Sequence, residues 1–549
     1  MAKSDLRIDI LGTSITISAD EEAAYLNTLL SKYRAAVENV QRASALNDPL
    51  KIAVLTGFLL CDDLYKAGTP PSGDRESGEL EQITLGMISR LEEVLQVSGT
   101  VDPPYRPDSA SPHTETELTV IDTFFKLQNT VKNFEWGSPK WLPELMGQKN
   151  LSRIPWAELW MGVHPAGPSR VIMPDGQGPL LSELIGGDPE TFLGKETAET
   201  FGKLPFLFKV VAAAKPLSIQ AHPNKKQAQE GFDRENRAGI PLDAPTRNYR
   251  DSNHKPEILC ALSPFAALCG FREAKEISAF ITILHAKSDG PLKSDLERLL
   301  SALEQTGRDA HAAGENPLKA FLGVLFSLSA ETFRALGLLL KNRQPLLEKD
   351  FPQYKDEWDL CSYFFSLYPG DSGVLAPLYL NIIELAPGEA IYLPAGVLHA
   401  YLHGMGIELM ADSDNVLRGG LTPKHVDVDE LLRILDFSAY KPDVLTLPDP
   451  VPALFTYPAP AGDFALSLMH GSDAAPCQGK EASILKEAPI LKEASIVMVS
   501  KGSATLTGKN GARMTLNAGE SVFIPAGEKA GVVFSGTFTA YAATAAPGR

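Results

Sequence analysis

Two segments of this chain repeat one pattern at an interval of 131 residues. The first is LAPGEAIYLPAG at 385–396, and the second is LNAGESVFIPAG at 516–527. Each contains a Gly-Glu turn, a short apolar run of strand length and a Pro-Ala-Gly turn, as expected for antiparallel strands joined by tight turns. Because the pattern occurs twice, it predicts two related antiparallel β units, and the rest of the chain must be arranged around them.

The two copies differ in chemistry. This strand-and-turn signature resembles that of cupin jelly rolls, which are double-sheet antiparallel barrels. The first copy continues into His399, whereas the second copy has Ala530 at the equivalent position. We therefore expect the second barrel to be metal-free and structural.

Length and composition favour several domains. The chain has 549 residues, enough for three or four domains, and its 44% hydrophobic and 22% charged residues are ordinary for a globular protein. Its net charge of −17 argues against sequence-independent nucleic-acid binding. Its five scattered cysteines form no CxxC pair, so no disulfide framework or thiolate zinc site is predicted. With no signal peptide or long apolar run, we expect a cytoplasmic protein that binds no membrane.

Composition also predicts where the domains begin and end. We expect a mainly β chain in which an all-helical insertion interrupts the first barrel, so that the strands on both sides of the insertion belong to one sheet system. A small α+β domain precedes the barrels. The predicted segments are a head domain at 1–97, a linker at 98–117, the first part of the first β domain at 118–271, the helical insertion at 272–350, the completion of that domain at 351–440, and the second barrel at 441–549.

The head domain has a recognisable pattern of its own. Residues 5–18 alternate apolar and polar side chains around Gly12-Thr13, which predicts a β-hairpin, and helical periodicity follows to about residue 97. With IDILGT at 8–13 and DPLKIA at 48–53, the unit resembles the ZapA family, which associates with the bacterial division protein FtsZ. The resemblance implies homo-oligomerisation through residues 1–97 and an FtsZ-type partner.

Four residues near strand ends are candidate metal ligands. Side chains two positions apart share one face of a strand, and Gln220 and His222 have this spacing. Glu257 opens another apolar run, and His399 follows the Pro-Ala-Gly turn. Two nitrogen and two oxygen ligands suit one zinc ion with an open position for substrate or water. His403 completes an HxxxH pair, but strand and turn precede it, so we expect it to orient a neighbour rather than to bind metal.

An ordered series of longer motifs resembles the type I mannose-6-phosphate isomerases over about residues 118–549. The motifs are FEWG at 134–137, WAELWMG at 156–162, LSIQAHP at 217–223, NHKPE at 253–257, GFR at 270–272, LHAYL at 398–402 and SDNVLRGGLTPKH at 413–425. The resemblance implies a zinc-dependent enzyme that interconverts mannose 6-phosphate and fructose 6-phosphate through an enediol. It also implies zinc ligands at the same four positions and an active-site arginine at Arg418. Asn224 departs from the family, which usually has Asp there.

The isomerase reaction moves a proton between C1 and C2 of the sugar. It needs a base within hydrogen-bond reach and positive groups near the developing oxyanion. Lys255 and Glu408 are the candidates for proton transfer. Arg418 stays protonated, so we expect it to stabilise the enediolate or to bind phosphate.

Further residues are expected to contact the sugar phosphate. Lys424, together with Arg418, is the candidate for a cationic pocket around the phosphate. Tyr401 lies two positions from the metal-ligand candidate His399, and it is the candidate donor to a sugar hydroxyl. Ser218 and Trp136 are expected to line the site.

Two other functions compete with the isomerase. An iron cupin oxygenase usually presents a His-x-His pair, whereas this chain has Gln-x-His. The other alternative is a non-catalytic sugar-phosphate-sensing module that the head domain links to the division apparatus. The intact ligand set and Arg418 favour the enzyme, because a degenerate relative is expected to have lost at least one of them.

Overall fold

The computed structural model describes most of the chain after residue 123. It covers residues 124–547 apart from gaps at 174–175, 177, 305–315, 473–492, 509–510 and 528–531. Of the preceding residues it describes two strands, at 4–10 and 13–19, and residues 36, 37 and 56. The chain divides into two compact units, Met1–Glu115 and Thr116–Arg549, which are described separately.

The first unit begins with the predicted hairpin. Strands β1 (Ser4–Ile10) and β2 (Thr13–Ala19) pair in antiparallel register, with Ile8 opposite Ile15. The hairpin that the alternating pattern predicts is therefore present, with its strands joined between Ile10 and Thr13. The helices predicted between about residue 20 and residue 97 lie outside the described residues, except at three helical positions.

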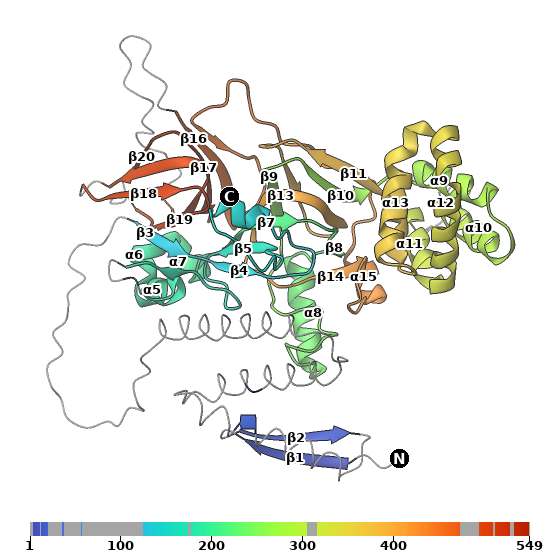
Figure 1. The fold of residues 1–549 in the computed structure, drawn as a ribbon, viewed down its shortest axis with the longest axis horizontal. Helices are drawn as coiled ribbons and strands as arrows, with labels where there is room; N and C mark the ends of the chain where they lie inside the picture. Colours follow the sequence, from blue (N-terminus) through green and yellow to red (C-terminus); the bar gives the residue numbers. More distant parts are fainter. Residues whose placement is uncertain are drawn as a thin grey trace, which may run out of the picture. The chain divides into compact units, whose positions relative to one another are not determined.

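Two antiparallel sheets and a helical segment make up the second unit (Figure 1). The ten-stranded sheet contains β4 (Thr130–Lys132), β5 (Glu158–Met161), β7 (Phe206–Ala213), β8 (Ile219–Ala221), β9 (Glu257–Ala261), β10 (Phe265–Phe271), β11 (Leu380–Leu385), β12 (Ala390–Leu393), β13 (His399–Ala411) and β14 (Leu417–Gly420). The nine-stranded sheet contains β3 (Phe125–Gln128), β6 (Arg170–Val171), β15 (Leu454–Thr456), β16 (Phe464–Gly471), β17 (Ser495–Thr507), β18 (Arg513–Asn517), β19 (Ser521–Ile524), β20 (Val533–Ser535) and β21 (Phe538–Ala545).

The sequence repeat has the same backbone in both sheets. The Gly-Glu turn joins β11 to β12 in one copy and β18 to β19 in the other. Gly388 and Gly519 occupy equivalent turn positions, with φ angles of 90° and 84°. Gly396 and Gly527 end the two copies, again with positive φ angles, of 79° and 111°. Glycine adopts this left-handed conformation without a steric cost, which explains why both copies have glycine there.

The two sheets pack against each other through one apolar core. Ile258 and Leu409 of the ten-stranded sheet belong to the same buried cluster as Leu466 and Met498 of the nine-stranded sheet. The first strand of this unit, β3, pairs with β19 near the C-terminus. The nine-stranded sheet is therefore not built from the C-terminal residues alone.

The helical segment lies between β10 and β11 in the chain, and its helices pack beside these strands (Figure 1). Its helices are α9 (Ala274–Ala286), α10 (Gly290–Glu304), α11 (Pro317–Ser327), α12 (Ala330–Asp350), η1 (Pro352–Tyr354), α13 (Lys355–Leu367), η2 (Ser372–Leu375) and α14 (Ala376–Tyr379). Helix continues past residue 350 because Trp358, Cys361 and Phe364 are buried at helical spacing. The strands on both sides of this segment, β10 and β11, pair with each other, as expected for a single sheet system.

Smaller helices flank the sheets. They are α4 (Trp141–Leu145), α5 (Leu181–Gly187), α6 (Pro189–Leu193), α7 (Lys195–Phe201), α8 (Lys225–Arg237) and α15 (Val428–Ile434). Asn224, the departure from the family pattern, is the N-cap of α8, and its side chain accepts a hydrogen bond from the backbone N–H of Gln227. An aspartate or an asparagine can serve at this position.

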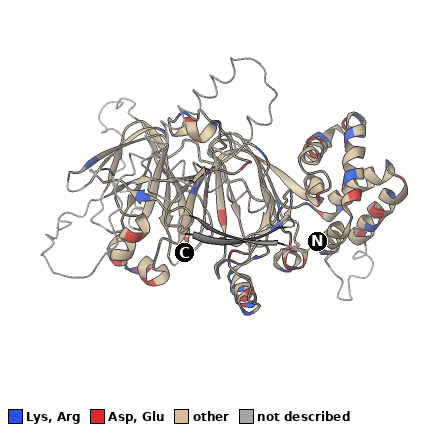
Figure 2. Ribbon diagram, turned by 60° about the horizontal axis from the view of Figure 1, so that its bottom comes forward, with Lys and Arg blue, Asp and Glu red and all other residues tan. Residues whose placement is uncertain are grey.

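Several helices carry Lys and Arg close to Asp and Glu, so residues of both signs are interspersed along them (Figure 2). In the described part of the chain, no single helix is long and apolar enough to cross a membrane. Helices α11 and α12 reach the required length and hydropathy only when they are taken together, and the chain bends by 99° at their junction.

Candidate metal centre

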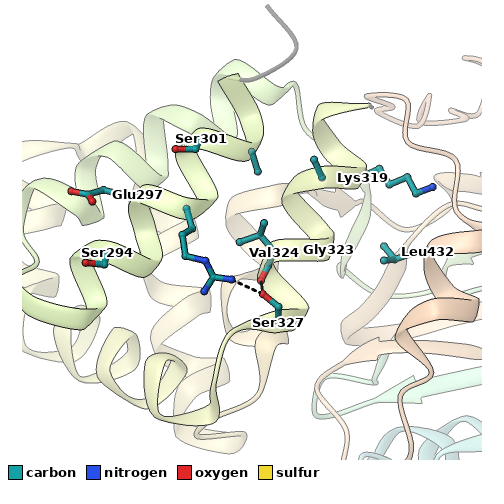
Figure 3. A pocket seen from close by; sticks show the side chains of 11 residues that line it. Ser294, Glu297, Ser301, Lys319, Gly323, Val324, Ser327 and Leu432 are labelled. Carbon is teal, nitrogen blue, oxygen red and sulfur yellow. Dashed lines mark hydrogen bonds between the residues drawn. The ribbon is translucent and has the colours of Figure 1, made fainter. Parts of the chain in front are cut away.

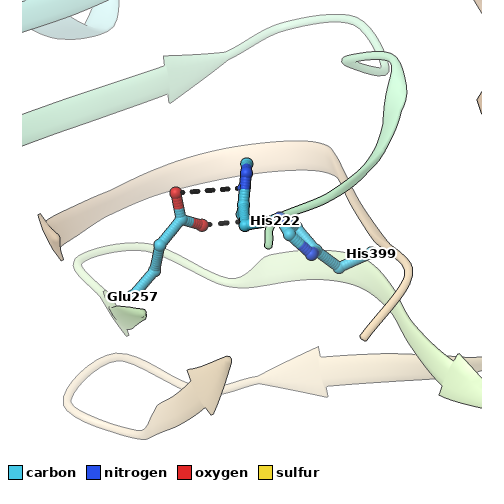
Figure 4. Close-up of side chains that lie close together, drawn as sticks. All are labelled: His222, Glu257 and His399. Carbon is cyan, nitrogen blue, oxygen red and sulfur yellow. Dashed lines mark ion pairs between the residues drawn. The ribbon is translucent and has the colours of Figure 1, made fainter. Parts of the chain in front are cut away.

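Three buried side chains from separate segments of the ten-stranded sheet converge (Figure 4). His222 follows β8, Glu257 opens β9 and His399 opens β13. Oε1 of Glu257 lies 3.4 Å from Nε2 of His222, and its Oε2 lies 3.4 Å from Nε2 of His399. All three side chains are at most 6% exposed.

The hydrogen bonds of the two histidines set their tautomers. Nδ1 of His222 lies 2.8 Å from the carbonyl oxygen of Asn415, and Nδ1 of His399 lies 3.0 Å from that of Val397. A carbonyl only accepts, so each Nδ1 carries the proton and each Nε2 presents a lone pair to Glu257. In the described chain, Nε2 of His222 has no hydrogen-bond partner. A histidine held through its second nitrogen is typical of metal ligands.

The triad fits a zinc ion in both geometry and charge. Two ligand atoms at about 2.1 Å from a tetrahedral zinc are about 3.4 Å apart, and each oxygen of Glu257 lies at this distance from one imidazole nitrogen. Burial, followed by the charge of Lys255, lowers the pKa of His222 well below its ordinary value. Burial opposes ionisation of Glu257, but Lys255 and the two histidines outweigh it and lower the pKa of that carboxyl. A neutral imidazole and an ionised carboxylate are the forms that bind a metal.

Gln220, the fourth predicted ligand, lies next to the triad. It is opposite His399 in the pairing of β8 with β13, and opposite Arg418 in the pairing of β8 with β14. Its Nε2 donates a hydrogen bond of 3.1 Å to Oγ of Ser218. Ser218 thus orients the amide of Gln220 and leaves the carbonyl oxygen, the metal-binding atom of an amide, without this contact.

The two candidates for proton transfer have different surroundings. Lys255 is buried and its Nζ lies 3.0 Å from Oε1 of Glu257, so it is placed at the triad. Glu408 is buried in an ion pair, with its Oε2 2.7 Å from Nζ of Lys209. Burial favours the neutral amine, but the carboxylates of Glu158 and Glu408 raise the pKa of Lys209. Glu408 therefore has a permanent cationic partner and is not a free base.

Lys209 and Glu158 were not predicted from the sequence. Oε2 of Glu158 accepts a 2.5 Å hydrogen bond from Nε1 of Trp160, whose ring lies 5.4 Å from Nζ of Lys209. A signal was present, because Lys209 is the one charged residue in the apolar run FLFKVVAA at 206–213. A lysine in a strand buried along its whole length must be paired, and pairing of this kind often marks a functional site.

Tyr401 and Trp136 lie in the apolar interior beside the triad. The ring of Tyr401 is 6.0 Å from that of His399, and Trp136 packs against the buried cluster that contains Tyr401. Burial, followed by the charges of Glu408 and Glu257, raises the pKa of Tyr401 well above its ordinary value. Within the described residues its hydroxyl has no hydrogen bond of good geometry, so it is a donor in need of an acceptor.

Arg418 and Lys424 lie close to a third cation, Arg250, that the sequence analysis did not select. Burial and the charge of Arg250 lower the pKa of Arg418. Burial, Arg418 and Arg250 lower the pKa of Lys424. The sequence did offer a sign of this role, because Arg250 lies three residues before the NHKPE motif, which contains a metal-ligand candidate.

The nine-stranded sheet also reaches this region. Nε2 of His254, the residue before Lys255, lies 2.8 Å from Oδ2 of Asp463, which immediately precedes β16. A second group of three potential metal ligands does not occur in the described parts of either sheet. Ala530 itself lies outside the described residues.

His403 has a different role from the one predicted. It is exposed, and its ring packs edge-on against Trp141, with the ring centres 5.0 Å apart. It is not one of the three side chains that converge in the triad.

A separate cavity of about 760 Å³ lies in the helical segment (Figure 3). Residues of α10 and α11 line it together with Leu432 of α15, and Arg298 and Ser327 are hydrogen-bonded at its wall. None of the triad residues lines this cavity. This cavity is therefore separate from the metal centre.

Comparison with known proteins identifies the family. The catalytic-domain model of type I phosphomannose isomerase matches residues 124–274. The mannose-6-phosphate isomerase of Escherichia coli is 42% identical over 405 residues, which cover 73% of this chain and 95% of that protein. This chain belongs to the mannose-6-phosphate isomerase family. The human member is 36% identical over 357 residues, which cover 62% of this chain and 81% of the human protein.

Solved structures of the family have the same fold. The Salmonella typhimurium isomerase bound to fructose 6-phosphate and zinc superposes with a TM-score of 0.66 at 36% identity. The match covers 77% of this chain and all of that one. A zinc-bound holo isomerase matches equally well.

The N-terminal unit has a second relationship. Residues 6–96 match the family model of the cell division protein ZapA. The matched range contains most of β1 and all of β2. The chain thus combines a ZapA-like head with an isomerase.

Proposed function

We propose that the second unit interconverts mannose 6-phosphate and fructose 6-phosphate. The observation that carries this proposal is the buried His222–Glu257–His399 triad, with its two imidazole lone pairs turned towards one carboxylate. Family membership and a substrate-bound relative support it. One zinc ion per chain would be held by the triad with Gln220.

The bound metal would supply a Lewis acid next to the oxygens of C1 and C2. The residues of this chain supply the remaining parts of the reaction. Nζ of Lys255 is the atom placed to move the proton between C1 and C2, because it is buried at the triad. Arg418 stabilises the negative charge of the enediolate, since a guanidinium keeps its proton.

The neighbouring side chains bind the substrate and exclude water. Lys424 binds the phosphate, and Tyr401 donates its unpaired hydroxyl to a sugar oxygen. Trp136 and the apolar cluster around Tyr401 keep water from the reacting carbons. Glu408 contributes indirectly, by holding Lys209 in place.

We also propose a finer description of the architecture. The ten-stranded and nine-stranded sheets correspond to two cupin jelly rolls, of which only the first binds metal. The domain limits follow the sequence prediction of 1–97, 98–117, 118–271, 272–350, 351–440 and 441–549, except that β3 and β6 join the second roll and helix continues beyond residue 350. The pairing of β10 with β11 across the helical segment supports the continuity of the first barrel.

For the head we propose homo-oligomerisation in the cytoplasm, with an FtsZ-type protein as a partner. The match of residues 6–96 to the ZapA model supports this role. The enzyme and the head then act independently, because they occupy separate compact units.

A coupled assay tests the isomerase directly. Fructose 6-phosphate formed from mannose 6-phosphate is measured with the native protein, after chelation, and after zinc is added back. We expect activity, its loss on chelation and its return with zinc. No turnover by zinc-loaded, folded protein would overturn the enzyme and favour a sugar-phosphate-sensing module.

A further inference from the structure

Three cations, Arg250, Arg418 and Lys424, lie near one another on segments next to the metal centre. Arg250, Arg418 and Lys424 form no ion pair, and their side chains make no hydrogen bond, within the described chain. The protein as a whole has 68 acidic residues against 51 Lys and Arg, so carboxylates are plentiful. None of the described carboxylates pairs with this cluster, which leaves a positive charge that an anionic ligand would neutralise.

Arg250 is fixed to the metal centre through Asn415. Its backbone N–H donates a 2.7 Å hydrogen bond to Oδ1 of Asn415, whose own carbonyl oxygen lies 2.8 Å from Nδ1 of His222. Arg418, three residues after Asn415, is opposite Gln220 in the strand pairing. Arg250, through Asn415, and Arg418, through the pairing of β14 with β8, are therefore both anchored beside the segment that presents Gln220 and His222.

Lys424 is held on the following loop. Oδ1 and Oδ2 of Asp371 accept hydrogen bonds of 2.8 Å and 3.3 Å from the backbone N–H groups of Leu421 and Thr422. Leu421 has a φ angle of 54°, a strained conformation for a leucine. Asp371 fixes this turn, so the position of Lys424 is also determined by the fold.

The three positive charges repel one another. Burial is the main cause that lowers the pKa of Arg418 and of Lys424, and Arg250 lowers both further. A phosphate monoester carries about −1.5 to −2 charges at pH 7 and offers three strong acceptor oxygens. It is the one part of the proposed substrate whose charge and size match such a cluster, and arginine binds it through two parallel hydrogen bonds.

We propose that Arg250 is a substrate-binding residue that holds the phosphate of the sugar phosphate together with Lys424, in the cation cluster that also contains Arg418. This inference rests on the proposed isomerase function for the identity of the ligand. Arg250 contacts the phosphate and takes no part in proton transfer. Its loss therefore weakens binding of ground state and transition state equally.

The test compares Arg250→Gln with Arg250→Lys and with Arg237→Gln, which removes one charge from the exposed face of α8. For Arg250→Gln we expect KM for mannose 6-phosphate to rise about tenfold or more, with kcat little changed. Inhibition by inorganic phosphate should weaken by a similar factor. Arg250→Lys should recover part of the affinity, and Arg237→Gln should match the wild type.

Two results would overturn the role of Arg250. One is a KM and a phosphate inhibition constant equal to those of Arg237→Gln, and the other is a fall in kcat with KM unchanged. If Arg250→Gln does not fold, Arg250→Lys carries the same comparison. If the wild type shows no isomerase activity, calorimetric binding of fructose 6-phosphate and of inorganic phosphate decides: weaker binding to Arg250→Gln supports the site, and equal binding refutes it.

Discussion

The carbonyl oxygen of Asn415 lies 2.8 Å from Nδ1 of His222, and the side chain of the same asparagine holds the loop that leads to Glu257. Its Nδ2 donates to the carbonyl oxygens of Asp251 and Asn253, at 2.8 and 2.9 Å. Asn415 is fully buried. One residue therefore orients a histidine of the triad and fixes the approach to its carboxylate.

Asn415→Asp should weaken zinc binding by about tenfold or more, as changes to the partners of metal ligands do. The aspartate keeps the acceptor oxygens but removes both donors to the loop, and it adds a charge near Asp251. Calorimetric titration of zinc into the metal-free protein measures the effect. Asn381→Asp is the matched control, because the amide of Asn381 also donates to backbone carbonyls, of Gly270 and Tyr440, in another part of the sheet. Equal zinc affinity of the two variants would refute this role.

Glu408→Gln should destabilise the protein by about 3 kcal/mol, since it leaves the buried ammonium of Lys209 short of one carboxylate. The pair is 8% and 6% exposed, so water does not replace the lost partner. Denaturant unfolding of the metal-free protein measures the change. Glu144→Gln is the control: its pair with Lys140 is 3.6 Å long and well exposed, so its loss should cost at most about 0.5 kcal/mol. A Glu408→Gln variant as stable as this control would contradict the account.

The stability of the metal-free protein should fall as the pH drops below about 6.5. Burial and Lys255 hold the pKa of His222 below its ordinary value, so the unfolded chain takes up a proton that the folded chain refuses. Because the unfolded state binds more protons, the free energy of unfolding rises with pH in this window. The contribution is fully present above the ordinary pKa of about 6.5 and decreases by at most about 1.4 kcal/mol for each pH unit below it.

Unfolding at pH 7.5, 6.5 and 5.5 in the wild type and in His222→Gln isolates this contribution. The other titratable groups are present in both proteins, so the difference between the two slopes belongs to His222. We expect the wild type to lose stability more steeply towards acid pH. Parallel slopes would show that His222 titrates normally in the folded protein.

Deletion of residues 1–110 should reduce the size of the oligomer and leave most of the isomerase activity. The two compact units divide near residue 115, and every residue of the triad lies in the second. Light scattering coupled to size-exclusion chromatography, with the isomerase assay on the same fractions, checks both expectations. Loss of activity in a truncated protein that remains folded would mean that the head completes the site.

Local patterns in the sequence were enough to predict the hairpin, the repeated turns and the three residues of the triad. Strand alternation places ligands two apart, and a repeated Gly-Glu turn needs glycine at a positive φ angle, so both leave a readable trace. The same reasoning excluded His403 as a metal ligand but expected it to orient a neighbour of the site, whereas its ring packs against Trp141.

Partners distant in the sequence could not be predicted in this way. The sequence indicates no partner for Glu408, but in the structure its carboxylate accepts a hydrogen bond from Lys209, 199 residues away. Arg250 meets Arg418 and Lys424 only because Asn415 ties two segments together. The membership of β3 in the C-terminal sheet likewise depends on a pairing across almost 400 residues. Contacts of this kind follow from packing, and no short pattern encodes them.

Zinc titration of the metal-free protein, with the initial rate of mannose 6-phosphate isomerisation as the readout, tests the central claim most directly. The account predicts that the rate rises linearly, stops rising at one zinc per chain, and stays at the baseline in His399→Ala at every zinc concentration. Full activity without zinc, or zinc-dependent activity in His399→Ala equal to that of the wild type, would contradict a metal centre built on His222, Glu257 and His399.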